Sequence, residues 1–193
     1  MKKLIFLISI LFNVLGYSQV YEAGLSYNIG SIMGETSSTF RDPFSPSNFG
    51  LIVKKNMNPR IAYRAGINRL NSADTNITEF SGGIDFNFIK YNLVRNQDNF
   101  KHSPYLTLEL AALTYKNSIS SGFAVALPIG IGYKQSINDF FIWSVEAKGR
   151  VTFSDDLDGI KTNKSTLDSF AYVSATIYYT FGWPKGSKNQ TKF

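Results

Sequence analysis

The stretch FIWSVEAKGRVTF, residues 141–153, places bulky apolar side chains and polar side chains at alternate positions. Phe141 and Trp143 share one parity, whereas Glu146 and Arg150 share the other. Successive side chains of a β-strand point to opposite faces, so the stretch predicts a strand with one apolar and one charged face. A soluble sandwich would also alternate, with the apolar face toward its core and the charged face toward water. The rest of the chain has to decide between the two.

The same alternation recurs along the chain. It predicts seven further strands, at about residues 21–29, 48–54, 60–68, 80–88, 105–110, 122–133 and 171–181. An even number of strands is typical of bacterial outer-membrane barrels. The predicted fold class is therefore all-β, an eight-stranded antiparallel transmembrane β-barrel, whose closure leaves no sheet edge in lipid. A secreted β-sandwich is the alternative, although it would not need so many uninterrupted apolar faces of about ten residues.

Long and short connections alternate between the predicted strands. The segments after the first, third, fifth and seventh strands include the two longest polar stretches and span about residues 31–47, 69–77, 116–121 and 154–168. Tight turns at 56–59 and 136–139 follow the second and sixth strands. In outer-membrane barrels the long loops face outside and the short turns face the periplasm. Residues 94–103 are an exception, because this connection should be a turn yet has about ten residues.

The composition agrees with a protein whose outer surface meets lipid. Charged residues make up 18% and aromatic residues 15% of the 193 residues, and so low a charge content is ordinary for such a surface. The absence of cysteine excludes disulfides, thiolate metal sites and a lipid anchor on an N-terminal cysteine. The formal net charge of +6 becomes +4 without Lys2 and Lys3, from 18 basic and 14 acidic residues, which does not argue for nucleic acid.

Residues 1–18 have the pattern of a secretory signal peptide, with two lysines, an apolar stretch at 4–15 and then small residues. About 12 apolar residues are too few to cross a bilayer as a helix. We expect cleavage between Ser18 and Gln19, and hence export to the outer membrane. The predicted domains are the signal peptide at 1–18, the barrel at 19–183 and a basic periplasmic tail at 184–193.

A barrel of this kind would turn its apolar faces to lipid and its charged faces inward. The interior of an eight-stranded barrel is just wide enough to be filled by side chains, which predicts a polar plug rather than a pore. Buried charges require partners. The expected network of lumen charges consists of Glu146, Lys148, Arg150, Glu109, Asp85, Arg64 and Arg60. The aromatic side chains expected to form a girdle at the periplasmic interface are Phe88, Tyr133, Trp143, Tyr179 and Phe181.

The sequence offers little for catalysis or metal binding. His102 is the single histidine, and a histidine in a polar turn without an oriented nucleophile is more often solvated than catalytic. The stretch SDDLDG, residues 154–159, lacks the spacing and the distal Glu of a calcium loop. We therefore expect no catalytic residue, metal, cofactor or small-molecule substrate.

Three stretches carry a resemblance to a known family. They are SPYLTLELAALTYKN at 103–117, FAVALPIGIGYKQSINDFFIWSVEAKGRVTFSDDLDGI at 123–160 and AYVSATIYYTFGWPK at 171–185. In this order they resemble the PorG-like outer-membrane proteins, the barrel component of the type IX secretion machinery. The segment GETSSTFRDPF, which begins at Gly34, departs from the family pattern.

The resemblance implies a non-enzymatic subunit that anchors or docks a periplasmic ring complex of PorK/PorN type. The overlong turn at 94–103 fits this role, because a connection longer than a hairpin needs usually has a use. The expected docking residues are Arg95, Lys101, Asn58, Asn138, Lys185 and Lys188. The alternative is a free-standing small barrel that acts in adhesion or membrane stability through its outer loops.

Overall fold

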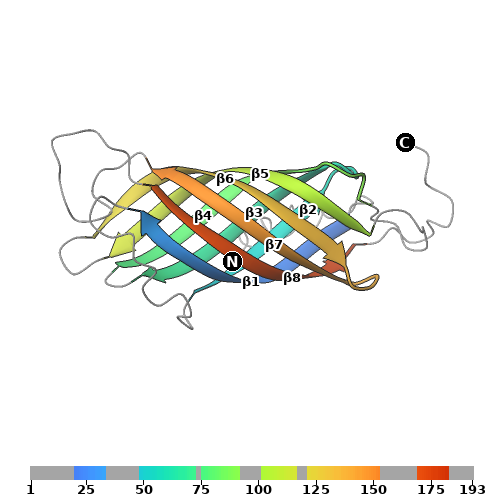
Figure 1. The fold of residues 1–193 in the computed structure, drawn as a ribbon, viewed down its shortest axis with the longest axis horizontal. Helices are drawn as coiled ribbons and strands as arrows, with labels where there is room; N and C mark the ends of the chain where they lie inside the picture. Colours follow the sequence, from blue (N-terminus) through green and yellow to red (C-terminus); the bar gives the residue numbers. More distant parts are fainter. Residues whose placement is uncertain are drawn as a thin grey trace, which may run out of the picture.

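The computed structural model of the chain describes residues 20–33, 48–72, 75–91, 101–116, 121–152 and 169–182. Its strands are β1 Val20–Met33, β2 Phe49–Asn56, β3 Ile61–Ser72, β4 Thr75–Asn87, β5 His102–Lys116, β6 Ser121–Ser136, β7 Phe141–Thr152 and β8 Ser169–Phe181. Each strand pairs antiparallel with its neighbours in sequence, and β1 pairs with β8 to close the barrel (Figure 1). The predicted fold class is confirmed, and the closed sheet rules out the sandwich.

No helix in the described part of the chain is both long enough and apolar enough to cross a membrane.

The two sets of alternating residues face the inside and the outside of the barrel. On β7 the inward positions Ser144, Glu146 and Arg150 are buried, whereas Phe141 and Val145 are exposed on the outer wall. Large apolar side chains are exposed on the outside of every strand, up to 65% at Ile131. A water-soluble protein rarely exposes so continuous an apolar band, but a barrel in lipid requires one.

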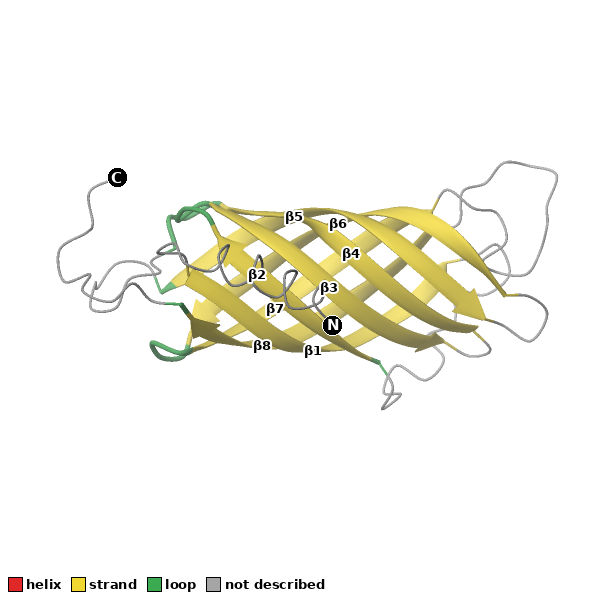
Figure 2. Cartoon of the chain, turned by 180° about the vertical axis from the view of Figure 1, so that it is seen from behind, coloured by secondary structure: helices red, strands yellow, loops and turns green. Residues whose placement is uncertain are grey.

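The β2–β3 turn, the β6–β7 turn and the described start of the β4–β5 connection lie at one end of the barrel, in green in Figure 2. We call this the turn end, because the β2–β3 and β6–β7 turns lie there. The opposite end, with the β3–β4 and β5–β6 connections, is the loop end. In outer-membrane barrels, short turns of this kind face the periplasm.

Two asparagine side chains hold the tight turns. The Oδ1 atom of Asn58 accepts the backbone N–H groups of the second and third residues after it, at 2.8 Å each. Asn138 does the same in the β6–β7 turn, at 2.9 and 2.8 Å. An asparagine that bonds to the backbone just ahead of it stabilises a turn. These two candidate docking residues therefore have a local structural role.

The connection between β3 and β4 is shorter than predicted. The expected loop at 69–77 is wrong, because Ser72 pairs with Thr75 and only residues 73–74 lie between the strands. Leu70 and Ile77 explain the difference, since both bury apolar side chains inside the barrel. We expected polar side chains at the inward positions, so these apolar residues did not fit the alternation. The predicted strands therefore ended too early on both sides of this connection.

Candidate functional site in the barrel lumen

The described lumen contains equal numbers of buried acidic and basic side chains. The acids are Glu22, Glu79, Asp85, Glu109 and Glu146, and the bases are Lys54, Arg64, Lys134, Lys148 and Arg150. Charges removed from water are costly unless they are paired and hydrogen-bonded. The five acids and five bases cancel in formal charge.

Arg64 on β3 is the centre of the network. Its guanidinium lies 2.7 Å from Glu146 Oε2 and 3.1 Å from Asp85 Oδ1, and its Nε lies 3.4 Å from Glu109 Oε1. Lys148 bridges two of the same carboxylates, with Nζ 2.5 Å from Glu109 Oε1 and 3.0 Å from Glu146 Oε1. Side chains from four strands are thus joined across the interior, which cross-links the barrel walls.

Aromatic side chains surround this centre on the side of the turn end. Lys54 forms a salt bridge with Asp85 at 2.7 Å, and its ammonium lies 4.9 Å from the ring centre of Tyr105 and 4.5 Å from that of Tyr178. The hydroxyl of Tyr105 donates to Glu146 Oε2 at 2.8 Å. Such contacts stabilise a buried cation both by pairing and by the negative faces of the rings.

Three tyrosine rings lie against glycines of neighbouring strands. A Cβ atom built on any of the three glycines would lie 2.4 Å from the facing tyrosine side chain; the pairs are Gly24 with Tyr178, Gly122 with Tyr115 and Gly132 with Tyr105. A contact this short cannot exist, so a larger residue would displace the ring. The small inward row of β6 therefore makes room for the tyrosine that orients Glu146.

A second ion pair lies toward the loop end. Arg150 binds both oxygens of Glu79, with Nη2 donating to Oε1 at 2.6 Å and Nε donating to Oε2. The same Nη2 donates to the hydroxyl of Tyr172, whose ring centre is 3.8 Å from the guanidinium carbon. Asn68 also donates to Glu79 Oε1, at 3.1 Å. A two-pronged contact of this kind is among the stronger ion-pair geometries.

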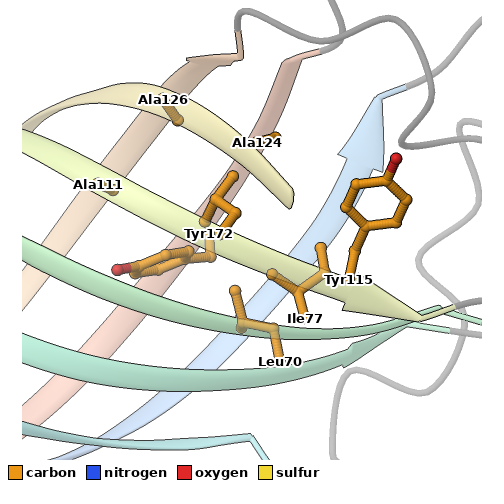
Figure 3. Packing of buried hydrophobic residues seen from close by; sticks show 8 residues of the cluster. Leu70, Ile77, Ala111, Tyr115, Ala124, Ala126 and Tyr172 are labelled. Atoms are coloured by element: carbon orange, nitrogen blue, oxygen red, sulfur yellow. The ribbon is translucent and has the colours of Figure 1, made fainter. Parts of the chain in front are cut away.

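Apolar side chains close the lumen beyond this pair (Figure 3). The cluster consists of Leu70, Ile77, Ala111, Leu113, Tyr115, Ala124, Ala126 and Tyr172. Leu113 and Ala126 are fully buried. Among the described residues, the interior toward the loop end is therefore packed with apolar side chains.

At the turn end, residues after β4 fold back over the opening. Tyr91 is 1% exposed and packs with Ile52, Ile142 and Tyr178. Its N–H donates to Pro59 O at 3.1 Å, and its hydroxyl is hydrogen-bonded to that of Ser136. Burial raises the pKa of the Tyr91 hydroxyl above its ordinary value, so the group stays protonated. The overlong connection therefore begins with an anchored segment.

Six of the seven charges expected in the lumen lie there together: Glu146, Lys148, Arg150, Glu109, Asp85 and Arg64. The prediction was wrong for Arg60. It lies exposed in the β2–β3 turn, where its guanidinium donates to Phe88 O at 2.9 Å. Strand parity does not apply to Arg60, because β3 begins one residue later, at Ile61.

Sequence reasoning missed four lumen charges, which are Glu22, Lys54, Glu79 and Lys134. The sequence did contain a signal for them, because each occupies a position that alternates with the outward-facing residues of its strand. Lys134, for example, follows Gly130 and Gly132 in the small row of β6.

The aromatic residues predicted as a girdle lie near the turn end. Tyr133 and Trp143 have ring centres 5.8 Å apart, and Tyr179 and Phe181 have ring centres 6.3 Å apart. Phe88 is exposed. His102 lies within β5 rather than in a turn, exposed, with its ring centre 6.0 Å from that of Tyr133. This contact with the aromatic group gives the imidazole a packing role.

Lys101 is exposed at the turn end, next to β5. The remaining docking candidates Arg95, Lys185 and Lys188, the tail at 184–193 and the signal peptide at 1–18 lie outside the described residues. No group of three or more His, Cys, Asp or Glu side chains suited to a metal ion occurs within the described ranges.

The family model described as "Domain of unknown function (DUF6089)" matches residues 67–183. No curated protein matches the chain. The crystal structure of Neisserial surface protein A (NspA) is similar, with a TM-score of 0.55 at 12% identity over 86% of this chain and 98% of that one. Ail, the attachment invasion locus protein of Yersinia pestis, gives 0.52 at 12% identity over 86% and 100%. The N-terminal β-barrel domain of Pseudomonas aeruginosa OprF gives 0.53 at 12% identity over 83% and 97%. These similarities show the fold of a small outer-membrane barrel.

Proposed function

We propose that this chain, which belongs to the DUF6089 family, is a non-enzymatic outer-membrane barrel that anchors a periplasmic ring complex of a type IX protein secretion apparatus. The main observation that supports the proposal is the packing of side chains inside the barrel. The ion pair of Arg64 with Glu146 joins opposite walls at the centre, and an apolar cluster packs inside the barrel toward the loop end. A barrel with so filled an interior would act through its ends or its outer wall.

The turn end is the docking face in this proposal. The resemblance of three stretches to the PorG-like proteins supports it, because partners of PorK/PorN type are periplasmic. The anchored start of the β4–β5 connection also supports it, since Tyr91 and Ser103 tie that connection to the barrel. The basic side chains Lys90 and Lys101 are exposed beside it. A basic rim would speed association with an acidic partner, and salt would weaken the docking.

Shortening the β4–β5 connection tests the proposal. The deletion falls within residues 93–100, so that Tyr91 and β5 stay intact. We expect a folded barrel that no longer co-purifies with periplasmic ring proteins from detergent-solubilised membranes and no longer supports secretion. The matched control is a deletion of similar length within residues 155–167, between β7 and β8, which should keep the ring. If the control released the ring and the first deletion retained it, the docking face would be on the other side of the membrane.

A second function, adhesion or membrane stability through the loop end, is supported by the fold shared with Ail, an attachment invasion locus protein. The same two deletions separate it from the first. Loss of cell attachment after the 155–167 deletion, with no co-purifying ring in the parent, would favour it.

A further inference from the structure

Lys134 is a buried ammonium group that the described barrel does not pair. It is fully buried near the turn end of β6, and its Nζ atom has no hydrogen-bond partner among the described residues. Each of the other four lumen bases lies within 4 Å of a carboxylate oxygen. A buried ammonium without an acceptor is costly. Lys134 is thus the one lumen base in the described structure that has no carboxylate oxygen within 4 Å.

The surroundings of Lys134 suit an incoming oxyanion. Its Nζ lies 4.4 Å from the ring centre of Tyr91 and 5.9 Å from that of Tyr105, and these aromatic faces only partly replace a hydrogen-bonding anion. Ser144, the partner of Lys134 in the β6–β7 register, is also buried, and its Oγ has no hydrogen-bond partner in the described part of the chain. Three ammonium hydrogens and one hydroxyl in the same part of the lumen therefore lack acceptors among the described residues.

Glu22 and Asp85 are the buried acids whose charges act on this lysine, and Glu22 sets a limit on the site. Its Oε1 accepts a hydrogen bond from Asn56 at 2.8 Å, while no salt bridge joins Glu22 to Lys134 in the described structure. A second carboxylate has to bind on the Lys134 and Ser144 side, away from Glu22. The exposed side chains of Arg60, Lys90 and Lys101 at this end would attract it.

Tyr91 covers the site from the turn end. It belongs to a connection and not to a strand, so it can move without breaking a β-ladder. Only the N–H bond to Pro59 and the hydroxyl bond to Ser136 hold it by hydrogen bonding in the described structure. Displacing this one side chain would expose Lys134 to the solution beyond the turns.

We propose that Lys134 and Ser144 form a carboxylate-binding site at the turn end and that Tyr91 is its lid. The commitment to a carboxylate follows from the four other lumen bases, all of which bind one. The site is independent of the type IX role, since it requires only access from the turn end.

Lysine acetylation of the refolded full-length barrel, followed by mass spectrometry, tests the lid. In the parent protein, Lys134 should stay unmodified while the exposed Lys101 reacts. Tyr91→Ala should raise the modification rate of Lys134 by about tenfold or more, because the group no longer needs a local opening to react. Tyr91→Phe keeps the ring and loses only the hydroxyl bond to Ser136, so it should raise the rate by no more than a few-fold. Equal rates at Lys134 and Lys101 in the parent would show that no lid exists.

Protection by anions tests the site itself. In the Tyr91→Ala protein, acetate should slow the modification of Lys134 by about tenfold at concentrations ten times its Kd, relative to chloride at equal ionic strength. Lys101 is the internal control and should not respond. Adding Ser144→Ala should weaken the protection. Equal rates in acetate and chloride would overturn the site, and protection by inorganic phosphate alone would overturn the carboxylate assignment.

A second variant keeps the proposal testable if Tyr91→Ala does not fold. Ser136→Ala removes only the hydroxyl partner of the lid. It should increase the modification rate of Lys134 by a few-fold, since the free energy of one hydrogen bond is about 1 kcal/mol. No increase would show that Tyr91 is not held as a lid.

Discussion

The loop end and the turn end of the lumen each contain a buried basic side chain, but the two side chains differ in their partners. At the loop end, Arg150 binds both oxygens of Glu79 and lies beside a packed apolar cluster. At the turn end, Lys134 faces tyrosine rings, among them that of Tyr91, and has no hydrogen-bond acceptor among the described residues. In the described structure, the base toward the loop end is thus paired with a carboxylate and the base toward the turn end is not. Stability should be concentrated at the first end and contact with partners at the second.

The largest loss is expected at the loop-end pair. Glu79→Ala should lower the free energy of unfolding by about 3–5 kcal/mol, because it leaves the Arg150 guanidinium buried without its carboxylate. Urea titration of the barrel in lipid vesicles measures the change. The double variant Glu79→Leu with Arg150→Met is the control and should recover most of the loss, since no charge is then left unpaired. A loss below about 1 kcal/mol, the range of exposed pairs, would contradict a sealed loop end.

The apolar cluster at the loop end should show the next largest effect. Leu113→Ala removes a fully buried side chain and should cost about 3 kcal/mol through the cavity that it leaves. Leu110→Ala on the same strand is the matched control. Leu110 is 64% exposed on the outer wall, where lipid can fill the space, so its loss should be smaller. Equal losses in the same titration would mean that the lumen is not tightly packed at this end.

The fold and the centre of the site could be predicted because both follow from strand parity. Glu146 and Arg150 share a parity opposite to the aromatic residues of β7, and this alone places them inside. Lys54 and Lys134 also lie at inward positions of the alternation. Each is a single charge among small or apolar neighbours, so the alternation indicated its inward position less clearly than it did for the charges of β7.

The remaining features depend on contacts that alternation does not record. Leu70 and Ile77 are apolar and inward, and hydrophobicity alone could not distinguish them from lipid-facing residues. The contact of Arg64 with Glu146 joins positions 82 residues apart and depends on how the strands are staggered around the barrel. Tyr91 belongs to no strand, so no periodicity pointed to it as a cover.

A smaller effect is expected at the tight turns. Asn58→Ala removes the acceptor for two backbone N–H groups and should destabilise the barrel by about 1 kcal/mol. Asn138→Ala should behave alike, because its turn is built in the same way. Neither change should weaken the binding of a periplasmic partner once the barrel has folded. Loss of a partner without loss of stability would show that these asparagines contact the partner directly, as the sequence predicted.

The smallest effect on stability is expected at Lys134, although it is as deeply buried as Arg150. Lys134→Met removes a cation that makes no hydrogen bond to the described residues, so no broken partner is left behind. The lost attraction to the Tyr91 ring, about 0.5–2 kcal/mol, is offset by the desolvation that an uncharged side chain avoids. We expect the free energy of unfolding to stay within about 1 kcal/mol of the parent value, or to rise. Arg150→Met in the same titration is the control and should be strongly destabilising, since it leaves Glu79 unpaired. A loss of about 3 kcal/mol or more at Lys134 would show that the ammonium is already paired and that the two ends of the lumen are built alike.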